Sequence, residues 1–528
     1  MFWLGMARSP TQFTEGFRVN FRIRKKLAER KRRIQARLDK TRLDCECPVI
    51  SASNIHYELA DRTQAISSGG IGMIHQMVKH LDLDAAINQH VNIFKIYLPY
   101  SESDHVLNIA YNLLAGGTRL EHLELRRSDE VYLNALGALR IPDPTTAGDF
   151  CRRFDPQDIV ALMETLNSVR IKVWQQQPDS FFEEAILDAD GTMVQTYGEC
   201  KEGMDINYKG QWGYHPLMIS LANTGEPLYI VNRSGNRPSH EGAAFYLDRS
   251  ISYCRKAGFR RIKVRGDTDF SQTEYLDGWD KDGVRFVFGI DAMANLYEIT
   301  EKLPEQAWKR LERPARYTVK TETRARPENV KEQIVEAREF ENIRLVAEYV
   351  AEFSYRPVKC NKEYRVVVVW KDLEVSKGQA KLFDKRICFF YITNDWTSTP
   401  EAIVFDANDR CNQENLIEQQ KNGVHALKAP LDNLTSNWAY MVMASLAWSL
   451  KAWAALLIPV HGRWKQKHET EKKTLLRMDF VTFRNAMIAI PAQIVRTAGK
   501  IIYRFLAWNP WQSVFFRLFA QLRKPMRC

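Results

Sequence analysis

The spacing of hydrophobic residues changes along the chain, and each change predicts a different kind of structure. From residue 51 to about 175 apolar residues recur every three or four positions, which predicts a small helical domain. From residue 181 they gather into short runs such as FFEEAILDAD, which predicts strands. Long charged strands are expected between about 300 and 395, and helical spacing returns at 399–423. The pattern therefore predicts an α/β protein.

The central part of the chain predicts a mixed sheet covered by helices. Its expected elements are strands at 181–190, 214–225, 226–235, 260–267 and 284–291 and a helix at 239–258. A tight Thr-Gly turn separates the second and third strands, which predicts an antiparallel hairpin. We expect Ser239 to cap the helix and Gly258 to end it.

One apolar stretch, residues 438–459, is long enough to span a bilayer. It is interrupted by Ser445, Ser449 and Lys451, and no other stretch resembles it. We therefore interpret it as a buried core helix, and a membrane span is the alternative. The first ten residues lack the apolar region of a secretory signal. The nine cysteines include no C-x-x-C pair, which indicates reduced thiols in a cytosolic protein without a zinc site.

The charge balance indicates a polyanionic partner. Lysine and arginine number 75 against 64 acids, giving a net charge of +11. Twelve of the basic residues fall within 18–42, on a helical repeat. Such a segment is either a solvated helix or an arm that neutralises phosphates, and its density favours the arm. The candidate DNA-contacting residues in it are Arg24, Lys25, Lys26, Arg30, Lys31, Arg32 and Arg33.

A second basic pair, Arg152 and Arg153, lies on the helix predicted within 141–154. The two prolines of this segment predict a turn, after which Thr145 or Thr146 caps the helix. A small helical domain with a basic helix is typical of a DNA reader. It is equally typical of a packing domain.

Two aspartates follow predicted strands of the central sheet. Asp190 ends the first strand, and Asp267 ends RIKVRGD. If the two strands are neighbours, the carboxylates emerge side by side and repel unless a cation lies between them. Oxygen ligands at such a position suit Mg²⁺ or Mn²⁺. A single aspartate at a strand end is more often a cap or turn residue, so the pair is the informative observation.

A third acid lies on the helix predicted at 399–423. Arg410, Glu414 and Lys421 are spaced i, i+4 and i+11, which falls within about 40° of one helix face. This stripe is either a surface ion pair, worth a few tenths of a kcal/mol, or a metal-binding glutamate between two cations that hold phosphates.

Together these motifs resemble the DDE transposases of bacterial insertion sequences. The matching residues are DGT after an apolar strand, RGDTDF at a later strand and R-x-x-x-E-x-x-x-x-x-x-K on a helix. The nearest match is the IS thirteen-eighty group, related to the IS4-like class. The aspartates are 77 residues apart and the glutamate follows 147 residues later, where this class carries a β-rich insertion. The resemblance covers about residues 140–450.

The resemblance implies that Asp190, Asp267 and Glu414 form the metal-binding catalytic triad of an RNase H-like core. Arg410 and Lys421 match the family's basic positions, and Ala407 stands where the family has tyrosine. Two ions, Mg²⁺ or Mn²⁺, would hold the scissile phosphate and allow cleavage and strand transfer without a protein nucleophile. The implied partners are double-stranded DNA, as terminal inverted repeats and target, and a second copy of the chain. The implied location is the bacterial cytoplasm, at the nucleoid.

The expected architecture is an α/β, RNase H-like mixed-sheet core with a β-rich insertion domain and an N-terminal helical DNA-binding region. Its segments are a basic arm at 1–50, a helical DNA-binding domain at 51–178, the core at 179–300 and 397–470, the insertion at 301–396 and a C-terminal helical region at 471–528. The last segment, broken at Pro510, is the candidate for dimerisation.

Several interpretations stay open at this point. The chain is either a transposase, a nuclease of the same core without a joining step, or an inactive relative that only binds DNA. Asp188 is a candidate supporting acid, and Asp269 is a weaker rival to Asp267. His215 reads as structural. Tyr208 and Trp212 either stack on DNA or plug the core.

Overall fold

The computed structural model describes residues 11–39, 55–57, 63–94, 99–313, 333–334, 338, 341–377, 380–497 and 499–526. The chain forms two compact units. The sheet unit comprises Gln177–Glu418 and Leu431–Trp438. The helical unit comprises Met1–Gln176, Gln419–Pro430 and Ala439–Cys528. The C-terminal segment thus belongs to the same compact unit as the N-terminal helices.

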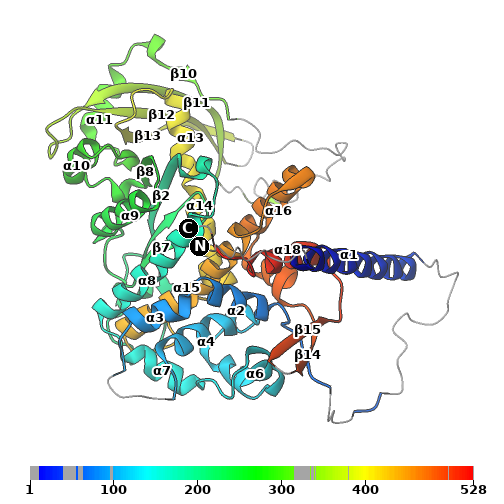
Figure 1. The fold of residues 1–528 in the computed structure, drawn as a ribbon. Coiled ribbons are helices and arrows are strands. Elements are labelled where there is room, and N and C mark those ends of the chain that lie inside the picture. Colours follow the sequence, from blue (N-terminus) through cyan, green and yellow to red (C-terminus); the bar gives the residue numbers. More distant parts are fainter. Residues whose placement is uncertain are drawn as a thin grey trace, which may run out of the picture. The chain divides into compact units, whose positions relative to one another are not determined.

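The sheet unit is built on one mixed sheet of nine strands (Figure 1). In spatial order the strands are β10 (Lys309–Arg310), β11 (Glu341–Tyr355), β12 (Tyr364–Lys377), β13 (Ala380–Thr393), β9 (Arg285–Ile290), β8 (Arg261–Gly266), β2 (Glu184–Gly191), β6 (Leu217–Leu221) and β7 (Glu226–Val231). Strand β8 runs parallel to both β2 and β9, and the other pairs are antiparallel. The predicted mixed sheet and the β6–β7 hairpin are therefore confirmed.

The β-rich block expected at 301–396 continues this sheet instead of forming a sheet of its own. Strand β13 pairs with β9, with Phe390 opposite Ile290. The valine run Val366–Val369 in β12 is buried throughout. A strand buried on both faces reads as a continuous apolar run, which explains why this strand is interior to the sheet. The strands of the β-rich block are therefore hydrogen-bonded to the central sheet.

The two faces of the central strands differ in chemistry. Ala185, Leu187 and Ala189 of β2 are buried and apolar, and Glu184, Asp188 and Asp190 alternate with them. Helix α9 (Ala243–Ala257) packs against β2, β6 and β8, and α14 (Cys411–Glu418) packs against β2. Figure 1 shows α9 and α14 on opposite sides of β2. Charged side chains of the central strands therefore face the side of α14.

Helix ends differ from the predicted caps. Helix α9 begins after Gly242 instead of Ser239, because the left-handed φ of +73° at Gly242 redirects the chain there. It ends at Gly258, also left-handed, as predicted. In the helical unit, α7 (Pro144–Arg152) is capped by Asp143, which accepts the backbone N–H of Thr146 at 2.9 Å. The predicted threonine caps were wrong because the aspartate precedes a proline at the first helical position.

The helical unit contains most of the remaining helices. They are α1 (Thr11–Leu38), α2 (Ile71–His80), α3 (Leu83–His90), α4 (Glu102–Leu114), α5 (Leu123–Arg127), α6 (Glu130–Leu136), α7, α8 (Pro156–Trp174), α16 (Lys465–Arg477), α17 (Phe480–Phe483) and α18 (Gln512–Gln521). Among the residues described, one helix, α15 (Leu434–Leu456), is long and apolar enough to cross a membrane. Its apolar window is completely buried, so the interpretation as a core helix is confirmed.

The C-terminal tail is not wholly helical. Strands β14 (Ala492–Thr497) and β15 (Lys500–Phe505) form a hairpin that also pairs with β1 (Ala65–Ile66). The helical expectation for IIYRF was wrong because Gly499, with a φ of +70°, makes the turn that brings Ile501, Ile502 and Tyr503 back as a strand. Within the described ranges Cys151, Cys200, Cys254, Cys360, Cys388 and Cys411 are free thiols.

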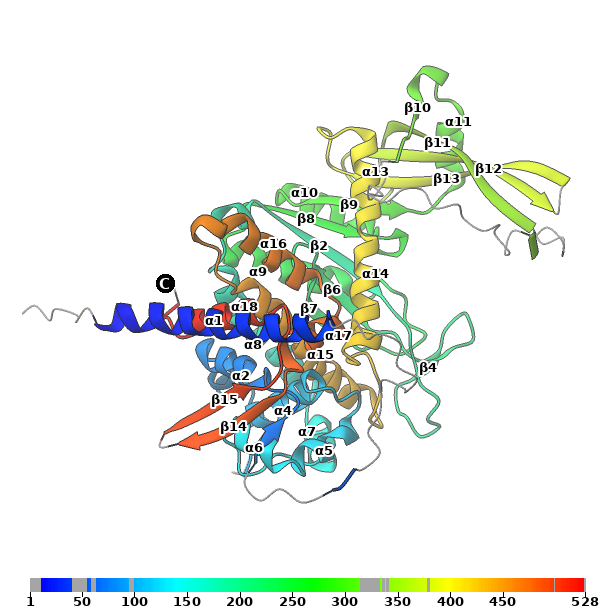
Figure 2. The same ribbon diagram turned by 90° about the vertical axis from the view of Figure 1, so that its right-hand side faces the viewer.

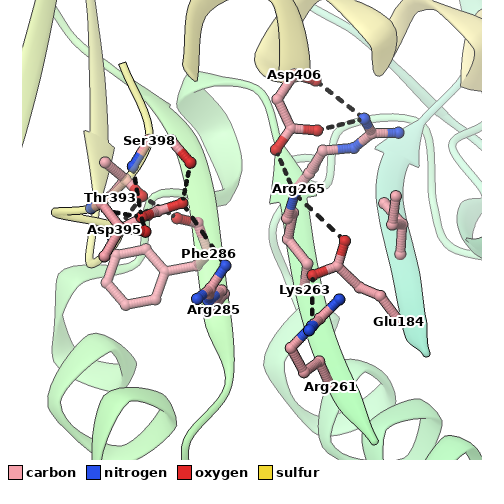
Figure 3. Close-up of polar contacts among 12 residues, drawn as sticks. Glu184, Arg261, Lys263, Arg265, Arg285, Phe286, Thr393, Asp395, Ser398 and Asp406 are labelled. Carbon is pink, nitrogen blue, oxygen red and sulfur yellow. Dashed lines mark hydrogen bonds and ion pairs between the residues drawn. The ribbon is translucent and has the colours of Figure 1, made fainter. Parts of the chain in front are cut away.

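The turn between β13 and α13 (Pro400–Asp409) is held by Asp395 (Figure 3). Its carboxylate accepts the backbone N–H and hydroxyl of Thr397 at 2.8 and 2.7 Å and the hydroxyl of Ser398 at 2.7 Å. Burial opposes ionisation, but the bonds from Ser398 and Thr397 outweigh it and hold the pKa of Asp395 well below its usual range. The ionised carboxylate therefore stabilises the entry into α13.

Replacing Asp395 by Asn is expected to lower the free energy of unfolding by about 2 kcal/mol at pH 7, since bonds to a charged acceptor are lost. A depressed folded-state pKa contributes stability that is complete above the unfolded value of about 3.9 and is lost as the pH falls further. The difference between the variant and the parent should therefore shrink below about pH 4. Urea unfolding at pH 7 and pH 3 measures it, and an equal difference at both pH values contradicts the account.

Candidate active site

Asp190 and Asp267 lie side by side at one edge of the central sheet. Strands β2 and β8 are parallel neighbours in which Asp188 is the register partner of Arg265. Two residues further along the chain, Asp190 lies near the carboxyl end of β2, and Asp267 directly follows the last residue of β8. Because side chains two positions apart in a strand point to the same face, Asp190 projects from the same face as Asp188, and the charge of Arg410 acts on both Asp190 and Asp267. The structure therefore brings together two acids that are 77 positions apart in sequence.

The electrostatics of this acidic pair are unfavourable without a cation. Burial raises the pKa of Asp190 to about 7, against the opposing charge of Arg410, and the charges of Asp267 and Glu414 add to the rise. Burial also raises the pKa of Asp267, again against Arg410. Arg410 Nη1 lies 3.3 Å from Asp190 Oδ2. This guanidinium opposes the effect of burial on both carboxyls, and both pKa values stay raised.

Glu414 lies on α14, next to a residue that fixes this helix to the sheet. The amide of Gln413 donates to the carbonyl of Met218 at 3.3 Å and accepts from the hydroxyl of Ser220. Met218 is the register partner of Asp190 in β6. Helix α14 is thereby anchored directly beside the acidic pair. Glu414 itself is exposed, within the electrostatic reach of Asp190.

The described residues contain no group of three or more acidic, histidine or cysteine side chains arranged to hold a metal ion. The structure thus brings Asp190 and Asp267 together and leaves Glu414 nearby but outside such a group. Oxygen donors at the ends of adjacent strands nevertheless suit a hard divalent cation.

The basic residue Lys421 is placed differently from the prediction. It lies in a π-helical turn, Gln419–Gly423, that follows α14. A π turn has a different angular spacing from an α-helix, so the 100° projection used for Arg410 and Glu414 does not extend to Lys421. Lys421 also belongs to the helical unit, whereas Arg410 and Glu414 belong to the sheet unit.

The basic N-terminal segment forms helix α1 in the helical unit. Six of its seven candidate DNA contacts are exposed: Arg24, Lys25, Lys26, Lys31, Arg32 and Arg33. Arg30 differs, since it is half-buried and donates to the carbonyls of Phe505 and Ala507 at 2.8 and 3.1 Å. This contact docks α1 on the C-terminal segment, so Arg30 has a structural role. The remainder of the predicted arm, 1–10 and 40–50, lies outside the described residues.

Arg152 and Arg153 lie at the C-terminal end of α7 in the helical unit. Both side chains are exposed. Arg152 forms an ion pair with Asp149 at 2.9 Å, and the guanidinium of Arg153 lies 5.8 Å from the ring centre of Phe94. These contacts are typical of a helix end and leave the expected role in DNA binding open.

A buried network of ion pairs precedes the acidic pair by two residues along the chain, and it was not predicted from the sequence (Figure 3). Arg265 donates to both carboxylate oxygens of Asp188, and it also contacts Asp406 of α13. Lys263, two positions earlier in β8, contacts the same Asp406 at 2.7 Å. The sequence RIKVRGD contained a signal of this network. Charged residues alternate there with apolar ones, whereas a strand buried on both faces is usually a continuous apolar run.

Other residues near the acidic pair are explained by the local structure. The ring of His215 lies over Gly191, where an added Cβ would come within 3.0 Å of Nε2, and its Nδ1 lies 2.8 Å from the carbonyl of Arg237. The structural interpretation of His215 accords with this packing. Tyr208 is 90% exposed and Trp212 is 45% exposed, so the plug interpretation of these two rings was wrong.

Ala407, where the resembled family has tyrosine, packs against a hydrophobic cluster under α13. The buried members of the cluster are Val287, Leu311, Val350, Val367, Val369, Ile403 and Val404. Ala407 therefore contributes to the packing of α13 against β9, β11 and β12 through this cluster.

Paired carboxylates at the ends of parallel strands are typical of enzymes that transfer phosphoryl groups with divalent cations. The sequence matches the family described as Transposase DDE domain group 1 over residues 49–527, and the chain belongs to this family. It is a DDE transposase, an enzyme class that cleaves DNA and transfers strands with divalent metal ions.

Two further comparisons were made. No curated protein matches the sequence. Among solved structures the chain is similar to the synaptic complex of the piggyBac transposase with hairpin DNA, at 10% identity and a TM-score of 0.34. That similarity covers 80% of this chain and 81% of the other.

Proposed function

We propose that Asp190 and Asp267, completed by Glu414, form the catalytic metal site of an enzyme that moves its own insertion sequence by cut-and-paste transposition. The observation that carries the proposal is the register of β2 and β8, in which Asp188 is opposite Arg265 and the two aspartates each follow two residues later. The proposed metal is Mg²⁺ or Mn²⁺, with two ions at the site. The proposed origin within the family is the IS thirteen-eighty group, on the motifs DGT, RGDTDF and Arg410-x-x-x-Glu414.

The strand order supports an RNase H-like core. Strands β2, β6 and β7 form an antiparallel meander, and β8 and β9 follow on the other side of β2, parallel to it. This order places the first strand in the middle of the core, with Asp190 at its carboxyl end. Strands β10 to β13 then extend the edge at β9 and occupy the interval between Asp267 and Glu414. The same interval was predicted to hold the insertion.

Each residue of the site has a defined task in this proposal. Asp190 and Asp267 would hold the divalent ions, which supply a nucleophile from water or a 3′-hydroxyl and stabilise the leaving oxygen when bound. Glu414 would complete the ligands through a movement of its exposed side chain toward Asp190. Arg410 would orient a phosphate oxygen of the bound strand, since its guanidinium already faces this edge. Lys421 is proposed to contact the same DNA.

The proposed partners are double-stranded DNA and a second copy of the chain. Exposed cations on α1 support a contact with phosphates of the terminal inverted repeats, and Arg152 and Arg153 are further candidates. A dimer is proposed because two ends of one element are held together for cleavage. The C-terminal region at 471–528 is the proposed dimer contact. The proposed setting is the bacterial cytoplasm, on nucleoid DNA.

The test is a reaction with labelled DNA that carries the inverted repeats flanking the coding region. With Mg²⁺ or Mn²⁺ the purified protein is expected to nick or cut the ends and to join the freed 3′-hydroxyl to a target plasmid. Chelation with EDTA should stop both reactions and leave DNA binding in place. Cleavage without joined product would instead identify a nuclease of the same core. Binding without cleavage would identify an inactive relative.

A further inference from the structure

The ionic network below the acidic pair is a bridge between the sheet and helix α13. Arg265 donates through Nε and Nη2 to the two oxygens of Asp188 at 2.7 and 2.9 Å. Its Nη1 donates to the carboxylate and the backbone carbonyl of Asp406 at 3.0 and 2.9 Å. The side chains of Asp188, Arg265 and Asp406 are 1%, 4% and 19% exposed. One guanidinium thus joins two strands and one helix in a site nearly closed to water. Figure 3 shows its contacts with Asp406.

A second cation fixes Asp406 from the same strand. Lys263 Nζ lies 2.7 Å from Asp406 and 3.6 Å from Glu184 of β2. Lys263 and Arg265 are two positions apart in β8, so both point to the face that α13 covers. Asp406 can therefore contact both Lys263 and Arg265 in only one position of the helix over the sheet. A rotation of the helix by one residue, about 100°, would remove the carboxylate from both.

The spacing of this bridge matches the spacing of the active site. Asp188 precedes Asp190 by two strand residues, a rise of about 6.6 Å, and Arg265 precedes Asp267 by two residues across the end of β8. Asp406 precedes Arg410 by four helix residues, a rise of about 6 Å. Asp406 contacts Arg265, and Arg410, one turn later, contacts Asp190. Successive turns of the helix therefore contact successive positions along the strands. Figure 2 shows α14, which carries Glu414, continuing from α13 along one line.

We propose that the Asp188–Arg265–Asp406 bridge is a positioning device of the transposase, which sets the rotation and register of α13–α14 over the strand ends. It rests on the proposed role of Asp190, Asp267 and Glu414. In the network Asp188 serves Arg265 and does not replace Asp190 as a metal ligand. Arg265 is suited to this role because a planar guanidinium serves two carboxylates at once, whereas an ammonium group lacks that fork.

The proposal predicts the effects of two variants that alter the bridge in different ways. Asp406→Asn keeps the shape of the side chain and removes its charge, and Arg265→Lys keeps the charge and removes the fork. Both are expected to lower the single-turnover cleavage rate of pre-bound DNA ends about 10- to 100-fold, the usual effect of removing a partner that orients ligands. The affinity for the DNA ends should stay unchanged, because the bridge is buried. The matched control is Asp409→Asn, an exposed acid on the same helix, which should leave the rate unchanged.

Hydrogen exchange of the metal-free protein gives a readout that does not depend on activity. In Asp406→Asn, amides of Cys411–Glu418 should exchange faster, while those of α9 keep their protection and unfolding stays cooperative. The proposal is overturned if both variants cleave like the parent, or if Arg265→Lys restores full cleavage through charge alone. It is also overturned if the rate falls only with the fraction of folded protein. Asp190→Asn run in parallel separates the two claims: if it still cleaves, the proposed metal site itself has failed.

Discussion

Asp190→Asn is expected to abolish DNA cleavage and strand transfer while the protein still folds and binds DNA. Removing a charged metal ligand forfeits several kcal/mol of transition-state stabilisation, and about 4 kcal/mol corresponds to about a thousandfold in rate. Burial raises the pKa of this carboxyl to about 7, so a neutral side chain at the position is tolerated by the fold. The melting temperature should therefore equal or exceed that of the parent at pH 8. Asp267→Asn is expected to behave in the same way.

The matched control is Asp269→Asn. Asp269 is exposed, lies two residues after Asp267 and offers its backbone N–H to the Asp267 carboxylate at 3.0 Å. The backbone contact survives the substitution, so cleavage should be preserved. Single-turnover cleavage of an end-labelled duplex, with binding measured separately by a mobility shift, distinguishes the three variants. Equal loss in Asp269→Asn and Asp267→Asn would contradict the assignment of Asp267 as the ligand.

Replacing the six exposed cations of α1 by glutamine is expected to weaken DNA binding strongly and to flatten its salt dependence. Each phosphate contact contributes about 0.9 to the slope of log K against log salt, so up to about 5 should be lost if all six bind. The residues are Arg24, Lys25, Lys26, Lys31, Arg32 and Arg33. Affinity measured between 50 and 200 mM salt reports the slope.

Arg30→Gln is the control for this variant. Arg30 donates to two carbonyls of the C-terminal segment, so its loss should loosen the docking of α1 and leave the salt slope nearly unchanged. Limited proteolysis within α1 measures the docking. A slope that stays the same in the six-residue variant would show that α1 does not contact phosphates, and it would move the electrostatic footprint to another part of the chain.

The mixed sheet and its acidic pair were predictable because local patterns determine them. Apolar runs ended by acid place Asp190 and Asp267 after strands, and chain spacing allows those strands to be neighbours. The hairpin at 214–235 and the core helix at 438–459 follow from equally local signals. The carboxyl-end arrangement then follows from parallel pairing alone.

Features that depend on distant contacts were not predictable. The charged residues Lys263 and Arg265 have no evident partner in sequence, because Asp406 lies 141 positions beyond Arg265. The continuation of the sheet through β13 depends on its pairing with β9, which no local pattern specifies. The projection that grouped Arg410, Glu414 and Lys421 on one face assumed regular α-helical geometry. That geometry does not hold in the π-helical turn that contains Lys421. The structural role of Arg30 was not predictable because nothing in the sequence distinguishes it from the basic residues beside it, which are exposed.

Three acids distant in sequence are expected to converge on divalent ions when DNA is bound. Anomalous scattering from Mn²⁺ in crystals of the protein with a DNA end measures this directly. Mn²⁺ is expected about 2.1 Å from carboxylate oxygens of Asp190 and Asp267, with Glu414 completing the ligands and the scissile phosphate on the open side. Manganese bound elsewhere, or a Glu414 carboxylate that stays beyond coordination distance in a complex competent for cleavage, would contradict it.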